Sequence, residues 1–250
     1  MENELKIRGM DHIVIDITYD CNMSCNNCNR LSNLCKRPES NMSIDDIKKF
    51  IKESEETGNP LRSIAVSGGE PSVHPDFEKI MALLSGYCLK NSIYLYLQTN
   101  GKTLDKINKL PDNVQINNSR KNSNNPYHYP FTIAPVDINF YYEDNNPCDT
   151  PFTCGRCLNK NGYYGCTISA AMDDILELNM GIKSIKYVNN DSLRNNTKKL
   201  CKYCSTYLVN MGILSWGNFD YQIKSPFWKE IIDKWCQKVS RTINLDNPSP

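Results

Sequence analysis

Three cysteines near the amino terminus have the spacing of a metal-binding loop. Cys21, Cys25 and Cys28 form the pattern C-x3-C-x2-C and stand among asparagines, which favour turns over helices. Cysteines at i, i+4 and i+7 would also share one face of a helix, but the asparagines argue against that alternative. Three soft thiolates in a compact loop are better explained as ligands of a metal.

The number of thiolates limits which metal centres this loop can hold. A structural zinc ion takes four ligands, which this loop supplies only if Cys35 or His12 joins it. An iron–sulfur cube is normally held by four thiolates, so three cysteines leave one iron open. An open iron is a place where a substrate or cofactor can bind.

A glycine-rich motif is the second candidate site. Its members are Gly68, Gly69, Glu70 and Pro71. Glycines allow the backbone to approach a ligand closely, and the glutamate can accept hydrogen bonds from a cationic amine. Further along the chain, Asn100 precedes a glycine, which fits a plain turn as well as a binding site.

Six more cysteines lie within residues 148–204. They are Cys148, Cys154, Cys157, Cys166, Cys201 and Cys204. Two of the pairs have CxxC spacing and would suit a zinc ribbon, but the gap between the pairs is long and Cys166 would be unused. The group predicts a second metal site, with iron–sulfur and zinc as the alternatives.

The expected elements alternate between strand and helix up to residue 116. Strands are predicted over residues 12–19, 61–66, 93–97 and 114–116, and helices over residues 44–57, 75–90 and 104–110. This alternation implies parallel strands with right-handed crossovers. Both motifs then follow the carboxyl ends of strands, where such folds carry their sites.

The second half of the chain has a different composition. A fifth strand is predicted over residues 131–140 and a closing helix over residues 226–239. Cysteine, glycine, asparagine and lysine become frequent after residue 143. We therefore expect two domains, residues 1–142 and 143–250.

The composition excludes several classes of protein. With 29 basic and 28 acidic residues the net charge is +1, without the basic excess of a nucleic-acid binder. The amino terminus has no apolar export segment, and no apolar run is long enough to cross a membrane. A chain with 12 cysteines and no export signal is expected to be a cytoplasmic metal or redox protein.

The cysteine triplet and the GGEP motif together resemble the radical S-adenosylmethionine (radical SAM) superfamily. The resemblance implies an α/β fold, a partial (β/α)6-type TIM barrel that five visible strands would leave truncated. It implies that the triplet holds a 4Fe–4S cluster and that residues 68–71 hold the amino group of S-adenosylmethionine (SAM). By the same resemblance, Asn100 belongs to the cofactor site, and Ser119 and Lys121 contact the SAM carboxylate.

The resemblance also implies a reaction. Reductive cleavage of SAM yields a 5′-deoxyadenosyl radical, which abstracts hydrogen from a peptide or small-molecule substrate. The electron comes from a reducing partner such as ferredoxin or flavodoxin. Only 20 residues precede Cys21, which favours a small molecule, or a peptide presented by a separate partner. The alternative is a non-catalytic iron–sulfur or zinc binding protein with a degenerate barrel, which Asn27 favours because the family usually has an aromatic or apolar residue there.

The second cysteine group resembles the SPASM and twitch extensions of the same family. The glycine turn at residues 162–165, followed by Cys166, is similar to their hairpin. This resemblance implies one auxiliary 4Fe–4S cluster. Its best four ligands are Cys154, Cys166, Cys201 and Cys204, with Cys157 or Cys148 as replacements for Cys154.

Overall fold

Six strands form one sheet in the computed structural model, which describes residues 11–25, 28–32, 37–58, 61–119, 148, 155–201, 203–204, 229–231, 233–234 and 237. The strand order is β4-β3-β2-β1-β5-β6. The strands are β1 (His12–Thr18), β2 (Ser63–Gly68), β3 (Tyr94–Thr99), β4 (Val114–Asn118), β5 (Arg156–Asn159) and β6 (Gly162–Tyr164). Every neighbouring pair is parallel except the β5–β6 hairpin.

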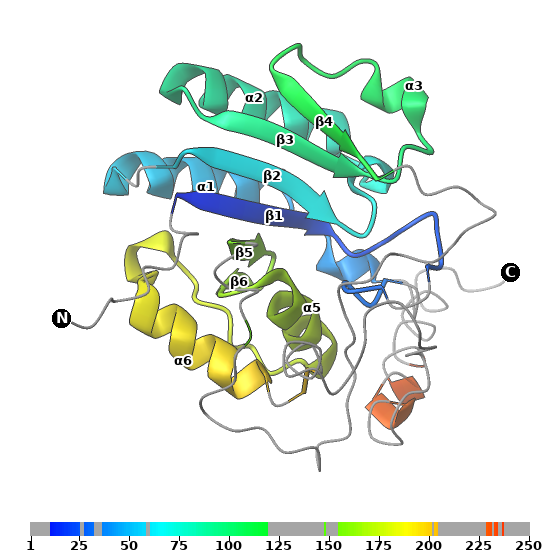
Figure 1. The fold of residues 1–250 in the computed structure, drawn as a ribbon, viewed down its shortest axis with the longest axis vertical. Helices are drawn as coiled ribbons and strands as arrows, with labels where there is room; N and C mark the ends of the chain where they lie inside the picture. The colour runs from blue at the N-terminus through cyan, green and yellow to red at the C-terminus, as the bar shows by residue number, and fades with distance from the viewer. Residues whose placement is uncertain are drawn as a thin grey trace, which may run out of the picture.

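The sheet confirms the predicted fold class. Helices α1 (Ile44–Thr57), α2 (Phe77–Asn91) and α3 (Leu104–Ile107) connect the first four parallel strands. The described strands form an open sheet, as a partial (β/α) barrel requires (Figure 1). β5 and β6 extend this sheet on the far side of β1, and Figure 1 shows α5 (Thr167–Leu176) and α6 (Asn190–Cys201) gathered around them.

The ends of α1 follow from its sequence. Ser43 and Asp46 form a reciprocal capping box: the Asp46 N–H donates to Ser43 Oγ at 3.1 Å, and the Ser43 N–H donates to the Asp46 carboxylate at 2.8 Å. Gly58 ends the helix in the left-handed conformation, with φ of 60°. The structure thus confirms the predicted helix over residues 44–57.

Three predicted elements begin later than expected, of which β3 does so by one residue, at Tyr94 instead of residue 93. β2 starts at Ser63 instead of residue 61, because its pairing with β1 begins with Ser63 opposite His12, and it continues through Gly68, which lies opposite Thr18. α2 starts at Phe77 instead of Pro75, because residues 71–73 form a separate single turn, η2 (Pro71–Val73).

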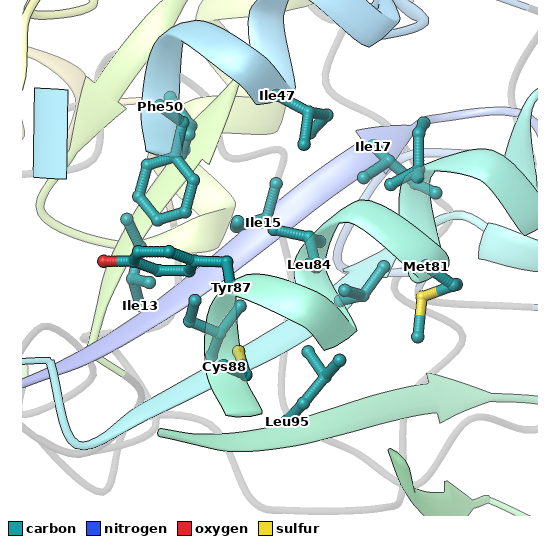
Figure 2. Close-up of a cluster of buried hydrophobic side chains, with 14 of the residues drawn as sticks. Ile13, Ile15, Ile17, Ile47, Phe50, Met81, Leu84, Tyr87, Cys88 and Leu95 are labelled. Carbon is teal, nitrogen blue, oxygen red and sulfur yellow. The ribbon is translucent and has the colours of Figure 1, made fainter. Parts of the chain in front are cut away.

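The main core lies between the sheet and helices α1 and α2. Alternate residues of β1, namely Ile13, Ile15 and Ile17, are fully buried against Phe50 of α1 and other apolar side chains (Figure 2). This alternation places Val14, Asp16 and Thr18 on the opposite face of the sheet. Cys88 of α2 is a buried thiol in this core, and burial raises the pKa of its thiol to about 12.

Some predicted features lie outside the described residues. They include the strand at residues 131–140, most of the helix at residues 226–239, the boundary near residue 142, and Cys35, Lys121 and Cys154. The two-domain division therefore stays a prediction. Among the helices of the described ranges, none combines the length and apolar character needed to span a membrane.

Candidate cofactor site

The first three cysteines line one cavity at the carboxyl ends of β1, β2 and β3. The cavity has a volume of about 380 Å³ and also borders Gly68, Gly69 and Asn100. Cys21, Cys25 and Cys28 lie outside any helix, as the open-loop interpretation required. The structure thus brings together the loop after the first strand and the motifs after the second and third.

The two glycines allow the end of β2 to approach the end of β1. A Cβ atom at Gly69 would lie 2.2 Å from the carbonyl oxygen of Asp20, and one at Gly68 would lie 2.0 Å from that of Thr18. Gly68 also has φ of 130°, which side chains other than glycine rarely adopt. The Gly69 N–H donates to Thr18 O at 2.8 Å, so this close approach is itself hydrogen-bonded.

Glu70 is fully buried and its carboxylate joins β2 to β3. One oxygen accepts hydrogen bonds from the Ser72 hydroxyl at 2.6 Å and from the Thr99 hydroxyl at 2.8 Å. The other oxygen accepts from the backbone N–H of Asn100 at 2.7 Å. These bonds place the carboxylate behind the lining of the cavity, where it fixes the backbone on which the site is built.

Asn100 forms both a turn and a contact with the cysteine loop. Its side-chain oxygen accepts from the Lys102 N–H at 3.0 Å, which is the expected turn. Its amide nitrogen donates to the side-chain oxygen of Asn22 at 2.8 Å and lies 3.9 Å from Cys21 Sγ. The turn is therefore confirmed, and Asn100 also lines the cavity, whereas its contact with a cofactor stays a prediction.

Ser119 borders the same cavity from the end of β4. Its N–H and its hydroxyl both donate to the carbonyl oxygen of Thr99, at 2.9 and 3.1 Å. Asn117 also lines the cavity, whereas Lys121 lies outside the described residues. His74 does not reach the cavity; its ring nitrogens bond to Met42 O and to the Asp76 N–H next to the start of α2.

The sequence analysis missed a buried ion pair beside the cavity. Arg30 follows the cysteine loop, lines the cavity, and donates from Nε to the Asp16 carboxylate at 2.8 Å. Asp16 is fully buried on the cavity side of β1, and burial raises the pKa of its carboxyl group while the Arg30 charge opposes this shift. A single aspartate within the apolar run of β1 was the available signal.

Most described cysteines of the second group lie in or at the ends of β5, α5 and α6. Cys157 is fully buried in β5, and Cys166 caps the amino terminus of α5 by accepting from the Ser169 N–H at 3.4 Å. Cys148 lies close enough to Cys166 to raise the pKa of its thiol, after the larger effect of burial. Cys201 and Cys204 share a tight turn at the end of α6, where the Cys204 N–H donates to Cys201 O. Cys154 lies outside the described residues.

A family model matches the part of the chain that builds this cavity. The family model described as the radical SAM superfamily matches residues 15–118, which include the cysteine loop, the glycine motif and β4. This family is a class of enzymes, and it implies a 4Fe–4S cluster and SAM.

Named relatives match the same part of the chain. GTP 3′,8-cyclase of Aliarcobacter butzleri is 32% identical over 103 residues, which cover 41% of this chain and 31% of that protein. Probable GTP 3′,8-cyclase of Methanococcus vannielii is 38% identical over 95 residues, which cover 37% of this chain and 29% of that protein. The matches therefore span about a third of the length of these relatives.

A solved structure is also similar to this chain. It is BtrN in complex with AdoMet and 2-DOIA, with a TM-score of 0.48 and 15% identity, and the match covers 78% of this chain and 92% of that chain.

The donor set of the first loop fits an iron–sulfur cluster. Three thiols of one loop border a single cavity. Within the described ranges, no three cysteine, histidine, aspartate or glutamate side chains converge as a single metal ion requires. A cube needs no such convergence, because each thiolate binds a different iron atom. Burial raises the pKa of the Cys21 thiol to about 11, so cluster binding there releases a proton.

Proposed function

We propose that this chain is a radical SAM enzyme that acts on a small molecule or a peptide. The observation that carries the proposal is that Cys21, Cys25 and Cys28 share one cavity with Gly68, Gly69 and Asn100. In this proposal, Cys21, Cys25 and Cys28 would hold a 4Fe–4S cluster, and the cavity that they line would also receive SAM.

The cofactors supply the hydrogen abstraction, and the protein supplies position. When bound, the reduced cluster provides the electron that cleaves SAM to the 5′-deoxyadenosyl radical. The backbone of residues 68–71 would orient the methionyl end of SAM, held in place by the Glu70 hydrogen bonds described above. Ser119, which follows β4, lines the same cavity and is the proposed contact for the SAM carboxylate, together with Lys121. The electron would come from a cytoplasmic partner such as ferredoxin or flavodoxin.

Two observations bear on the proposed substrate class, namely the cavity lining and the names of the relatives. The cavity lining is rich in amides and hydroxyls, including Gln98, Asn117 and Ser119, and so suits a polar substrate. The relatives are named for a reaction of GTP, which makes a purine nucleotide the first small molecule to test. A peptide presented by a partner protein is the second.

The second cysteine group is proposed to hold an auxiliary 4Fe–4S cluster. The burial of Cys166 and Cys204 in one apolar cluster, with Cys148 near Cys166, supports a shared site. The proposed ligands are Cys154, Cys166, Cys201 and Cys204. Cys148 remains the alternative to Cys154, and Cys157 is the weaker one because its side chain lies beside Asp16.

Anaerobic reconstitution tests the catalytic proposal. The protein reconstituted with iron and sulfide, and then given dithionite and SAM, should release 5′-deoxyadenosine. Cys25→Ala should abolish this product, while Cys88→Ala, a buried cysteine of the distant core, should not. A well-formed cluster that yields no 5′-deoxyadenosine would favour a non-catalytic iron–sulfur protein with a degenerate barrel.

Metal analysis tests the auxiliary cluster separately. Two cubes correspond to about eight iron atoms per chain, whereas one cube with a zinc appendage corresponds to about four iron atoms and one zinc. A variant with Cys166, Cys201 and Cys204 changed to Ala should retain about four iron atoms. Loss of all iron from this variant would contradict the proposed division of ligands.

A further inference from the structure

Arg37 lies at the base of the cysteine loop in a fully buried position. A buried guanidinium is costly unless charged and polar groups surround it. Here Nη1 donates to the Asp174 carboxylate at 3.0 Å, and the guanidinium lies 4.2 Å from the centre of the Tyr19 ring. The side chain is thus held by the end of β1 on one side and by α5 on the other.

The same residue holds both ends of the cysteine loop. The backbone N–H of Arg37 donates at 2.9 Å to the carboxylate of Asp20, which is the residue immediately before Cys21. Its Nη2 donates to the carbonyl oxygen of Arg30, two residues after Cys28. Because Asp20 and Arg30 flank the loop, Arg37 fixes the separation of the two ends.

Asp174, the partner of Arg37 in α5, is itself held by other hydrogen bonds. Asp174 is buried and accepts additional hydrogen bonds from the Ser40 hydroxyl at 2.7 Å and from the Asn161 amide at 3.1 Å. Asn161 lies in the β5–β6 turn, and Cys166 caps the amino terminus of α5. The Arg37–Asp174 pair therefore connects the first cysteine loop to the helix whose amino terminus is capped by Cys166.

We propose that Arg37 is a positioning residue that holds the first cysteine loop in its cluster-binding shape, and that Asp174 couples this loop to α5. The part of this proposal that concerns cluster binding rests on the proposed function. The part that concerns the shape of the loop does not. Outer partners that orient metal ligands typically change metal affinity 10- to 100-fold when they are removed. We expect an effect of that order from breaking this pair.

The test compares two neighbouring carboxylates of α5. Asp174→Asn keeps the shape of the side chain but removes the charge that compensates Arg37. Asp173→Asn is the matched control, because Asp173 is also buried but bonds to the Tyr164 hydroxyl and the Met180 N–H. Any general damage to α5 should appear in both variants.

Two measurements are made on each variant. The first is the rate at which a chelator removes iron from the cluster whose EPR signal changes when SAM is added. The second is amide hydrogen exchange of residues 21–25 in the protein without cluster. We expect Asp174→Asn to lose iron about tenfold faster than Asp173→Asn and to exchange faster in the loop.

The outcomes separate this inference from the proposed function. Equal iron loss and equal exchange in the two variants would overturn the role of Arg37 and Asp174. If the wild-type protein takes up no SAM-sensitive cluster, the proposed function fails, and the exchange measurement alone decides the role of Arg37. Arg37→Lys gives an independent check: it keeps the charge but cannot reach both Asp174 and Arg30 O, and should behave like Asp174→Asn. Wild-type behaviour of Arg37→Lys would contradict the role.

Discussion

The backbone N–H of Asn100 donates a 2.7 Å hydrogen bond to the buried carboxylate of Glu70, which ties the end of β3 to the segment after β2. The side chain of Asn100 continues this connection to Asn22 in the cysteine loop. The glutamate therefore acts on the loop through the backbone of another strand, whatever else it contacts when SAM is bound.

Glu70→Gln should destabilise the protein because the amide cannot accept hydrogen bonds at both of its ends. If the new oxygen keeps the bonds from Ser72 and Thr99, the new NH2 group faces the Asn100 N–H, which loses its acceptor. A buried donor without a partner costs about 1–3 kcal/mol in the free energy of unfolding, measured by urea denaturation. Glu78→Gln is the control: this exposed glutamate lies in the first turn of α2, so its loss should cost only the roughly 0.3–1 kcal/mol of its interaction with the helix dipole. An unchanged midpoint for Glu70→Gln would show that these hydrogen bonds contribute little.

Gly69→Ala should prevent the tight joining of β1 and β2, because its Cβ would lie 2.2 Å from Asp20 O. Backbone shifts of this kind in a packed region cost on the order of 1–3 kcal/mol and should lower the thermal midpoint. Gly86→Ala is the control: Gly86 lies in α2 with no atom within 4 Å of its added Cβ, so alanine should stabilise the helix by about 0.5–1 kcal/mol. A change of the same sign in the thermal midpoint of both variants would contradict this account.

His74 should make stability fall in mild acid. Burial lowers the pKa of its ring in the folded protein, and the bonds to Met42 O and from the Asp76 N–H both suit the neutral ring. As the pH falls below about 6.5, the unfolded chain binds a proton that the folded protein does not, so unfolding becomes more favourable. The contribution is complete above that pH and is lost below it, at no more than about 1.4 kcal/mol per pH unit.

Urea denaturation between pH 5.5 and 7.5 measures this dependence. His74→Gln should reduce the slope of the unfolding free energy against pH. His12 contributes with the same sign, because burial also lowers the pKa of its ring, so a variant with both histidines changed should have a smaller slope than either single variant. A slope that both substitutions leave unaltered would exclude histidine as its source.

Replacing only one partner of the Asp16–Arg30 pair should lower the free energy of unfolding strongly. Asp16→Asn leaves the Arg30 charge buried without its carboxylate, which costs about 3–5 kcal/mol in the free energy of unfolding. Adding Arg30→Gln removes the uncompensated charge, so the double variant should be more stable than Asp16→Asn alone. Strict additivity of the two substitutions would show that the pair has no coupling energy. Lys79→Gln, which breaks an exposed pair, is the control and should leave stability unaltered.

Local signals in the sequence predicted most of the first 118 residues. The capping residues Ser43 and Gly58 define α1, and the alternation of elements gives the parallel order of the first four strands. Both ends of β2 were predicted two residues early, since its true extent depends on its register with β1, from Ser63 opposite His12 to Gly68 opposite Thr18. Glycine usually ends a strand, so sequence reasoning placed it in a loop.

The site was predictable where ligands are close in sequence and not where they are distant. The cysteine triplet and GGEP motif were recognisable by spacing. The contacts of Arg37 with Asp174, and the place of β5 beside β1, join parts of the chain more than a hundred residues apart. The four residues of β5 carry no periodicity that indicates which strand they pair with. Only the folded structure therefore reveals this pairing and the contact between Arg37 and Asp174.

The interior position of β1 has a consequence for how the chain is made. β1 is synthesised before either of its neighbours, and its second neighbour, β5, follows only after more than half of the chain. Until then, the apolar stretch Ile13-Val14-Ile15 has an open edge, which is a template for pairing with other chains. Newly made protein is therefore most prone to aggregate before the hairpin emerges from the ribosome, and truncation ahead of residue 156 would make that exposure permanent.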